Sequence, residues 1–467
     1  MLSAKGMTIP LTSNIEQAFQ SLNTNKMGIL LAVDSDERVI GCITDGDIRR
    51  QLLQSNDLKA PIAQFVNRDF VWCRAGMPRE QILKLLDHRV RAVPLLDNSN
   101  RLVGICTRED FNPDEEAEVF SRARSPARIS FNGGGTDLTH HFIDQGGTVI
   151  NTTISRYAHA ALRRRPDDSI RIYSHDLRRT LEAPDLQSLD MTGDCRLLAG
   201  AIRVVRPRFG FELEVAADFP VGSGLGGSAA VVAAVIGCFN EFRSDPWNRH
   251  QIAEMAFQAE RLVLDIPGGW QDQYASVFGG FNFMEFSADQ NTIMPMRLEQ
   301  RTLLEIEESL VLCHTGKKHD SGAIHREQKK RAAAPEELRR ITDRQKQLTR
   351  EMRHHLLRGD ISAYGHLLHE GWLAKRALSS LVSDGEMDRI YDFAVQHGAL
   401  GGKILGAGGG GYFLFFVPPF RRYPFSEAMK SFGYTCERIQ FEQEGLQSWK
   451  TRFAGDSAQI SSSLQRT

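Results

Sequence analysis

Four glycines lie within six residues, 222–227, and Ser228 follows them directly. Residues 209–215 alternate between apolar and polar, which predicts a strand, and the alanine-rich residues 229–239 predict a buried helix. Glycine lets the backbone turn tightly and approach a ligand closely. The free N–H groups of a helix's first turn, at the positive end of its dipole, would point into this loop. The pattern predicts an anion site, and the phosphate of a nucleotide suits it.

The residues around these glycines narrow the kind of nucleotide site. A P-loop has a lysine before its serine, and none precedes Ser228. The dinucleotide pattern is formally met by Gly222, Gly224 and Gly227, but residues 240–265 supply no second strand for a βαβ unit. A glycine turn with a purely structural role stays open as an alternative.

Two carboxylates that follow glycine breaks are candidates for work on an acceptor. Three glycines, 133–135, precede Thr136 and Asp137, and a carboxylate there can accept hydrogen bonds from two sugar hydroxyls. Asp272 follows the break at residues 266–269 and could take or orient a hydroxyl proton. The alternatives are a hairpin turn with Asp137 as a cap and an N-cap at Asp272.

The first 120 residues contain an internal repeat. The pattern Gly-x-x-Thr-x-x-Asp occurs twice, 63 positions apart, as Gly41, Thr44, Asp47 and as Gly104, Thr107, Asp110. Each copy is expected to hold an amphipathic helix, two strands joined by a polar turn, and a closing helix that starts near the aspartate. The threonine and aspartate could serve only as caps of that helix.

Over about residues 8–115 this order resembles paired CBS modules. In such modules the threonine and aspartate of the signature hold a ribose, which implies a nucleotide at Thr44 with Asp47 and at Thr107 with Asp110. The string at residues 44–50 also looks like CBS pairs attached to enzymes of sugar-phosphate metabolism.

Composition excludes several classes of protein. The chain has 467 residues, enough for two or three domains, and its formal net charge of −1 favours neither nucleic acid nor a membrane surface. The longest apolar run, residues 229–239, is too short to cross a bilayer, and the first ten residues do not resemble a signal peptide. The 7 cysteines form no C-x-x-C pair, which argues against structural zinc and a disulfide framework. We expect a reduced, cytoplasmic protein.

Three stretches, residues 125–138, 220–229 and 403–411, resemble in order the three motifs of the GHMP kinases, such as galactokinase, homoserine kinase and mevalonate kinase. The resemblance implies an α+β fold: a two-domain GHMP kinase with a ribosomal-S5-like N-terminal half, preceded by an α/β CBS pair. It implies ATP and Mg²⁺ as cofactors. The ATP-binding residues would be Gly222, Ser223, Gly224, Leu225, Gly226, Gly227 and Ser228.

The same resemblance implies roles for the acceptor side of the site. Arg128 falls on the arginine beside the reacting hydroxyl, Asp137 on the sugar-binding aspartate, and Asp272 on the catalytic base. Ser228 and Glu260 match the Mg²⁺ ligands, although a helix glutamate alone would be read as solvated. Further substrate contacts would come from the first and third motifs, at Gly134, Gly135, Thr136, Gly408, Gly409 and Gly410.

Residues 122 to about 450 are similar to the D-glycero-D-manno-heptose 7-phosphate kinases and their sugar-1-kinase relatives, through residues 132–137, 271–274, 279–282, 369–375 and 401–408. This implies ATP-dependent phosphorylation of the anomeric hydroxyl of the heptose 7-phosphate, which gives the 1,7-bisphosphate. Contacts to the 7-phosphate are expected from Lys317, Lys375, Arg376 and Lys403.

Two stretches depart from this pattern: Trp270 stands where the family commonly has a basic residue, and residues 317–319 stand where it commonly has an arginine. A fucose- or mannose-type 1-kinase and a non-catalytic nucleotide sensor are the alternatives.

The expected organisation is a CBS pair at residues 1–115, a linker at 116–121, kinase domains at 122–300 and 301–454, and a disordered tail at 455–467. The CBS pair is expected to bind an adenine or sugar nucleotide and to regulate the kinase. The other expected partners are a small sugar phosphate and further copies of the chain in a homo-oligomer.

Overall fold

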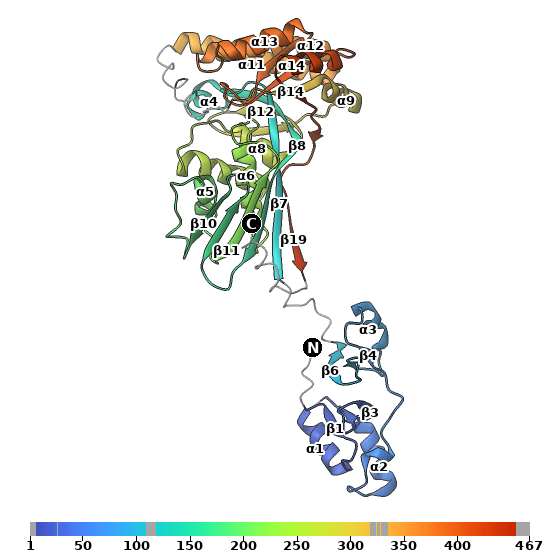
Figure 1. The fold of residues 1–467 in the computed structure, drawn as a ribbon. Helices are drawn as coiled ribbons and strands as arrows, with labels where there is room; N and C mark the ends of the chain where they lie inside the picture. The colour runs from blue at the N-terminus through green and yellow to red at the C-terminus, as the bar shows by residue number, and fades with distance from the viewer. Residues whose placement is uncertain are drawn as a thin grey trace. The chain divides into compact units, whose positions relative to one another are not determined.

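The computed structural model describes residues 6–25, 27–108, 118–317, 324, 327 and 335–453. The expected ligand residue Asp110 and the expected tail at 455–467 lie outside these residues. The chain divides into two units, Met1–Glu116 and Ala117–Thr467. Figure 1 shows both units, and each is described by itself.

The first unit consists of two similar halves. The first half contains β1 (Thr8–Pro10), α1 (Ile15–Asn25), β2 (Ile29–Val33), β3 (Val39–Thr44) and α2 (Asp45–Ser55). The second half follows a short helix, η1 (Ile62–Gln64), and contains β4 (Cys73–Arg74), α3 (Arg79–Leu85), β5 (Ala92–Leu96) and β6 (Leu102–Thr107). Each half has a three-stranded sheet, in the orders β1-β2-β3 and β4-β5-β6.

Strand register confirms the 63-residue repeat. Ile29 pairs with Thr44 in the first half, and Ala92 pairs with Thr107 in the second. Arg38 forms an antiparallel bridge with its own counterpart, Arg101. A shared apolar cluster that includes Leu31, Val39 and Leu96 joins the halves. The two halves therefore pair with each other partly through equivalent residues, as expected of paired CBS modules.

The second unit is built on a nine-stranded sheet. Its strands are β7 (Glu118–Asn132), β8 (Gly147–Arg164), β9 (Ile170–Ser174), β10 (Arg179–Ala183), β11 (Phe211–Ala217), β12 (Phe281–Phe286), β13 (Asn291–Pro295), β18 (Phe441–Glu442) and β19 (Gln447–Phe453). The main order is β10-β9-β11-β8-β12-β13, while β7 pairs with β8 and β19. The associated helices are α4 (Thr139–Gln145), α5 (Arg196–Val205), α6 (Gly227–Asn240), α7 (Arg249–Phe257), the π-helical turn η3 (Gln258–Val263) and α8 (Gln271–Phe278).

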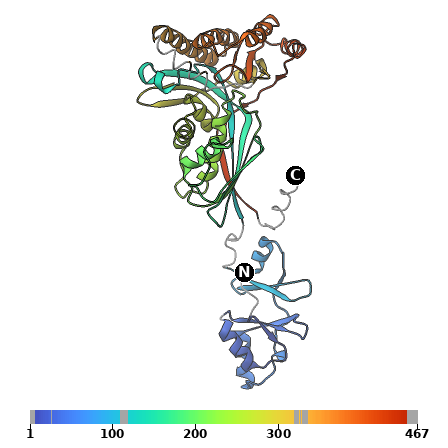
Figure 2. The same cartoon turned by 60° about the vertical axis from the view of Figure 1, so that its left-hand side comes forward.

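A second, four-stranded sheet has the order β15-β16-β14-β17. Its strands are β14 (Leu310–His314), β15 (Gly401–Ile404), β16 (Tyr412–Phe416) and β17 (Cys436–Glu437). The helices of this part are α9 (Gln300–Ser309), α11 (Pro335–Arg358), α12 (Ile361–Leu378), α13 (Gly385–Gln396) and α14 (Arg422–Ser431). Figures 1 and 2 show α11–α14 gathered at one end of the large sheet.

Two expected boundaries need correction. Strand β7 begins at Glu118, so the last four residues of the expected linker, 118–121, pair with β19 instead of lying outside the fold. The chain also returns from the second sheet to the first, because β18 pairs with β8 and β19 pairs with β7. Residues 441–453 therefore belong to the large sheet and not to a separate domain at 301–454.

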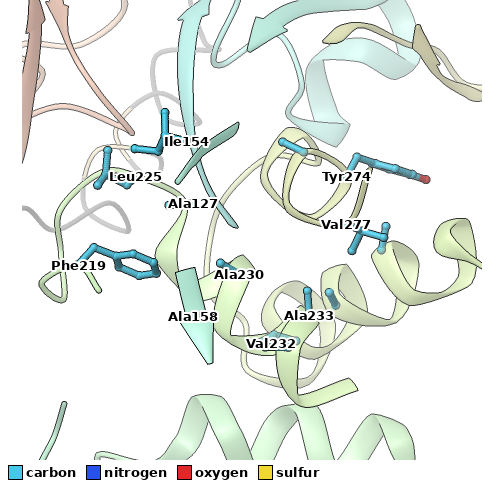
Figure 3. Packing of buried hydrophobic residues seen from close by; sticks show 14 of the residues in the cluster. Ala127, Ile154, Ala158, Phe219, Leu225, Ala230, Val232, Ala233, Tyr274 and Val277 are labelled. Carbon is cyan, nitrogen blue, oxygen red and sulfur yellow. The ribbon is translucent and has the colours of Figure 1, made fainter. Parts of the chain in front are cut away.

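Helix α6 occupies the centre of the main apolar cluster. Residues 229, 230 and 232–239 of this helix are all buried, since alanine, valine and glycine allow close approach to neighbours on every side. In Figure 3 the side chains of Ala230, Val232 and Ala233 lie in this cluster with Ala158 of β8 and Val277 of α8. This packing fixes the N-terminus of α6, where the glycine loop ends.

Candidate functional site

The glycine loop leads from β11 into the N-terminus of α6. Gly222, Gly224 and Gly226 have φ angles of 77°, 79° and 71°, a region that side chains disfavour. Gly226 is the N-cap residue, and no side chain caps the helix there. First-turn amides without a side-chain cap are suited to bind an anion.

A cavity of about 300 Å³ lies beside this loop. The expected site residues on its wall are Arg128, Gly134, Gly135, Asp137, Gly222, Ser223, Gly224, Gly226, Gly227, Ser228, Asp272 and Lys375. The loop expected to bind the nucleotide and the aspartate expected to address the acceptor therefore face one cavity, although they are far apart in the sequence.

Arg128 and Asp272 form a bidentate ion pair in this cavity. Arg128 Nε donates to Oδ1 of Asp272 and Nη2 donates to Oδ2, both at 2.9 Å. Nη1 also donates to the carbonyl oxygen of Gly224 at 2.6 Å, which ties the pair to the glycine loop. Asp272 lies in the first turn of α8, while the N-cap position belongs to Trp270. The N-cap alternative for Asp272 is therefore wrong.

Asp137 is 2% exposed, at the cavity wall, and its carboxylate accepts hydrogen bonds from backbone amides. Its Oδ1 accepts from Gly135 N at 2.9 Å, and its Oδ2 accepts from Gln271 N at 3.1 Å. Burial and the nearby charge of Asp272 raise the pKa of Asp137. A Cβ on Gly269 would come within 1.9 Å of Oδ2, so glycine is required for this contact. The next helix, α4, has Leu138 as its N-cap, so Asp137 does not cap it.

Ser228 and Glu260 form an oxygen pair at the end of the glycine loop. Ser228 Oγ donates to Glu260 Oε1 at 2.5 Å, and Gln273 donates to the other carboxylate oxygen. Glu260 lies in the π-helical turn η3 and is fully buried, so it is not the solvated residue that a helix glutamate usually is. Such turns recur at functional sites. Because Mg²⁺ prefers oxygen ligands and shares its shell with phosphates and water, these two residues fit it.

The third glycine motif packs against the glycine loop. A Cβ on Gly406 would lie 2.8 Å from the Cα of Gly224, so the two loops touch backbone to backbone. Lys375 of α12 braces this contact, since its Nζ donates to the carbonyl oxygens of Ile404 and Gly406 at 2.9 and 2.6 Å. Burial, with Lys403 and Arg128 nearby, holds the pKa of Lys375 well below its usual range.

Several expected contacts lie away from the cavity wall. Lys317 forms ion pairs with Asp384 at 2.9 Å and Glu386 at 2.6 Å, and Arg376 pairs with Asp388 at 2.9 Å. Lys403 is buried and donates to the Phe131 carbonyl oxygen at 3.1 Å. The other expected site residues that do not line the cavity are Leu225, Thr136, Glu260, Gly408, Gly409 and Gly410.

Part of the cavity wall was not predicted from the sequence. Ser130, Gln271 and Arg261 line the cavity, and each stands one or two positions from a residue that was singled out. Arg261 Nη1 and Nη2 donate to the carbonyl oxygens of Ile266 and Gly269 at 3.2 and 3.4 Å. An apolar part of the wall was also missed: Leu197, Ala217, Phe219, Pro220, Val221 and Val231. Polar residues adjacent to a motif were the available signal.

In the first unit, Thr44 and Asp47 form a capping box at the start of α2. Thr44 Oγ1 accepts from Asp47 N at 3.3 Å and donates to an Asp47 carboxylate oxygen at 2.6 Å. This is the geometry of the capping alternative. The equivalent Thr107 ends β6, and its partner Asp110 lies outside the described residues.

Three family models match this chain. The N-terminal domain of GHMP kinases matches residues 196–280, the C-terminal domain matches residues 352–435, and the CBS domain matches residues 4–54 and 62–112. A D-glycero-alpha-D-manno-heptose 7-phosphate kinase from Campylobacter jejuni is 35% identical over 335 residues, which cover 70% of this chain and 98% of that protein. The chain belongs to the GHMP kinase family.

Solved structures agree with this membership. A D-glycero-D-manno-heptose 1-phosphate kinase from Bacteroides thetaiotaomicron is 27% identical with a TM-score of 0.60, and the match covers 72% of this chain and 100% of that one. A putative sugar kinase from Campylobacter jejuni is 32% identical with a TM-score of 0.59 and the same coverage.

This GHMP kinase is an ATP-dependent sugar kinase, which the relatives' activities and the paired GHMP domains establish. The enzyme interpretation is therefore confirmed, and so is the α+β GHMP fold with a CBS pair before it. Among the residues that the structure describes, no helix is long and apolar enough to span a membrane.

Proposed function

We propose that this kinase phosphorylates the anomeric hydroxyl of D-glycero-D-manno-heptose 7-phosphate and produces the 1,7-bisphosphate. The observation that carries the proposal is the Arg128–Asp272 pair on the wall that also holds the glycine loop. The similarity to a heptose 7-phosphate kinase over 98% of its length supports the choice of sugar.

In this mechanism the glycine loop and the first turn of α6 bind the phosphates of ATP. Asp272 accepts the proton of the anomeric hydroxyl, whose oxygen attacks the γ-phosphorus while the bond to ADP breaks. Arg128 orients Asp272 through both carboxylate oxygens and places positive charge beside the transferred group. Asp137, fixed by Gly135 and Gln271, accepts hydrogen bonds from sugar hydroxyls.

Ser228 and Glu260 would hold Mg²⁺ in this scheme. When bound, the ion supplies neutralising charge to the nucleotide phosphates. The hydrogen bond between Ser228 Oγ and Glu260 Oε1 places both oxygens together at the end of the glycine loop.

A basic side chain that binds the 7-phosphate is expected on the cavity wall. Lys317 and Arg376 form ion pairs with acidic side chains, and the buried Lys403 donates to the Phe131 carbonyl oxygen. Among the described residues on the wall, the basic side chains are Arg128, Arg261 and Lys375. Arg128 is paired with Asp272, and Lys375 is buried, donates to two carbonyl oxygens and has a lowered pKa. We therefore propose Arg261 for this role; its Nη1 lies 3.8 Å from Glu260 Oε1.

A substrate panel tests the proposal. Purified protein with ATP and Mg²⁺ should turn over a heptose 7-phosphate with kcat/KM at least tenfold above that for the unphosphorylated heptose, fucose or mannose. No turnover of any heptose 7-phosphate would exclude the proposed substrate. Preference for an unphosphorylated sugar would favour the alternative 1-kinase, to which an L-fucokinase/L-fucose-1-P guanylyltransferase from Bacteroides fragilis lends support at 26% identity over 377 residues.

For the first unit we propose adenine- or sugar-nucleotide binding that modulates the kinase, in a homo-oligomeric assembly. The match of two CBS domains supports this, as does the recurrence of the Thr44 position at Thr107 in register. Titration of the full chain with AMP, ADP, ATP and sugar nucleotides, followed by kinase rate, tests it.

A further inference from the structure

Two buried side chains on the cavity wall carry oxygens without a hydrogen-bond partner among the described residues: Ser130 Oγ and Gln271 Oε1. Ser130 is 4% exposed and Gln271 is 7% exposed. A buried polar atom that lacks a partner is costly, so such atoms are usually satisfied by water or a ligand. Because both residues line the cavity, a ligand that enters it can supply the missing partner.

Both side chains border one backbone position, Gly134. A Cβ built there would lie 3.4 Å from Gln271 Nε2 and 3.8 Å from Ser130 Oγ, which are ordinary contact distances. Gly133 and Gly135 have positive φ angles of 84° and 100°, whereas Gly134 is not among the residues with positive φ. Neither backbone strain nor a clash therefore requires glycine at 134. What its missing side chain provides is space between Ser130 and Gln271.

The chemistry of this position selects its ligand. An unpartnered amide oxygen needs a donor, and a phosphate dianion offers only acceptors. The Asp137 carboxylate, which accepts from Gln271 N, also disfavours a phosphate beside this position, whereas the charge of Asp272 is balanced by Arg128. A neutral hydroxyl can donate to Gln271 Oε1 and can both donate to and accept from Ser130 Oγ.

We propose that Ser130, Gln271 and the open position at Gly134 form a specificity subsite that binds one or two neutral hydroxyl groups of the acceptor sugar. The subsite rests on the acceptor being a sugar and not on its being a heptose. It orients the ring: the hydroxyl-bearing carbons face Gly134, and any phosphate of the acceptor points away from Asp137 and Asp272.

Three variants of the full-length protein test the subsite: Ser130→Ala, Gln271→Leu and Gly134→Ala. The first two remove hydrogen-bonding groups at nearly constant shape, and the third fills the space without a clash. Each is expected to raise KM for the acceptor about tenfold or more, while KM for ATP stays within about twofold. Ser276→Ala is the matched control, because Ser276 on α8 also has a buried, unpartnered Oγ but lies off the cavity wall. It should leave both constants unchanged.

Deoxy analogues of the acceptor supply a readout that a merely structural role would not move. Wild type should lose about tenfold in kcat/KM on the analogue that lacks the bound hydroxyl. Ser130→Ala or Gln271→Leu should lose no more than about twofold on that same analogue, because the contact is already absent. The subsite would be overturned if, for every analogue, the loss caused by the variant multiplied with the loss caused by the missing hydroxyl. An unchanged KM for the acceptor in both variants would also overturn it.

This cycle of variants and deoxy analogues tests the subsite separately from the choice of substrate. If wild type prefers a sugar other than a heptose 7-phosphate, the heptose proposal fails, and the same cycle is run with deoxy forms of the preferred sugar. If Gly134→Ala does not fold, the two polar variants decide the outcome.

Discussion

Asp272 is held by one arginine that reaches both of its oxygens and, through Nη1, the glycine loop as well. Asp272→Asn keeps the shape but removes the proton acceptor, so kcat should fall about a thousandfold. The affinity for ATP should change by less than about threefold, measured by calorimetry with a non-hydrolysable analogue.

Asp388→Asn is the matched control for Asp272→Asn. It breaks another arginine–carboxylate pair, with Arg376, away from the cavity wall, and should leave kcat unchanged. If Asp272→Asn retained a tenth of wild-type kcat, Asp272 would not be the base.

The buried Lys403 should make the free energy of unfolding depend on pH. Burial and the charge of Arg128 lower the pKa of Lys403 to about 7. In unfolded chains lysine titrates near about 10.4, so between these values the unfolded state holds a proton that the folded state has released. Stability from this group therefore rises as pH increases from 7 towards 10 and is lost as pH falls to 7.

Lys403→Met removes this dependence. The free energy of unfolding of wild type minus that of Lys403→Met should increase by about 2 kcal/mol from pH 7 to pH 9. Urea unfolding at both pH values measures it, with the exposed Lys430→Met as the control for losing one lysine. A difference that does not vary with pH would show that Lys403 is not neutralised by its surroundings.

At the scale of elements, the glycine loop depends on the third motif for its shape. Gly224→Ala would force a side chain onto a φ of 79° and place its Cβ 2.8 Å from the Leu405 carbonyl oxygen. We expect a loss of about 2 kcal/mol in stability and a rise of about tenfold in KM for ATP.

Gly433→Ala separates backbone strain from the clash in this experiment. Gly433 has a φ of 101°, and nothing lies within 4 Å of a Cβ there. This control should cost about 1 kcal/mol in stability and leave the kinetics unchanged. If Gly224→Ala behaved like Gly433→Ala, contact between the two glycine loops would not shape the ATP site.

Local sequence was enough to predict the elements that carry the motifs. The expected helix at 229–239 is α6, and the expected strand at 209–215 is β11, shifted by two residues. The Arg128–Asp272 pair spans 144 positions, so only the family resemblance pointed to it. Pairing of β19 with β7 was not predicted, because side-chain alternation identifies a strand but not its partner.

The phosphate contacts show why single charges are hard to interpret from sequence. Lys317 and Arg376 have the chemistry to bind phosphate, but Asp384, Glu386 and Asp388 occupy them in the fold. Ser130 and Gln271, in contrast, carry no charge and were not predicted as site residues. Their importance rests on buried oxygens without partners, a property that exists only once β7 and α8 are packed.

At the scale of the whole chain, the two units divide near residue 116, and the large sheet begins at once with Glu118. A variant that starts at Ala117 keeps every residue of β7. Its kcat and KM should lie within about twofold of those of the full chain assayed with ATP and no added effector nucleotide. Nucleotides that alter the full chain's rate, other than by competing with ATP, should not alter the variant's rate. Steady-state kinetics with and without AMP or a sugar nucleotide provides the comparison.

A second truncation, starting at Arg122, tests where the kinase unit begins. It removes 118–121, which pair with the β19 residues 450–453. Because a strand edge loses its partner, this variant should melt several degrees below the one that starts at Ala117. Equal melting temperatures would restore the linker to 116–121, whereas loss of activity in the longer variant would make residues 1–116 part of the catalytic unit and not a regulator of it.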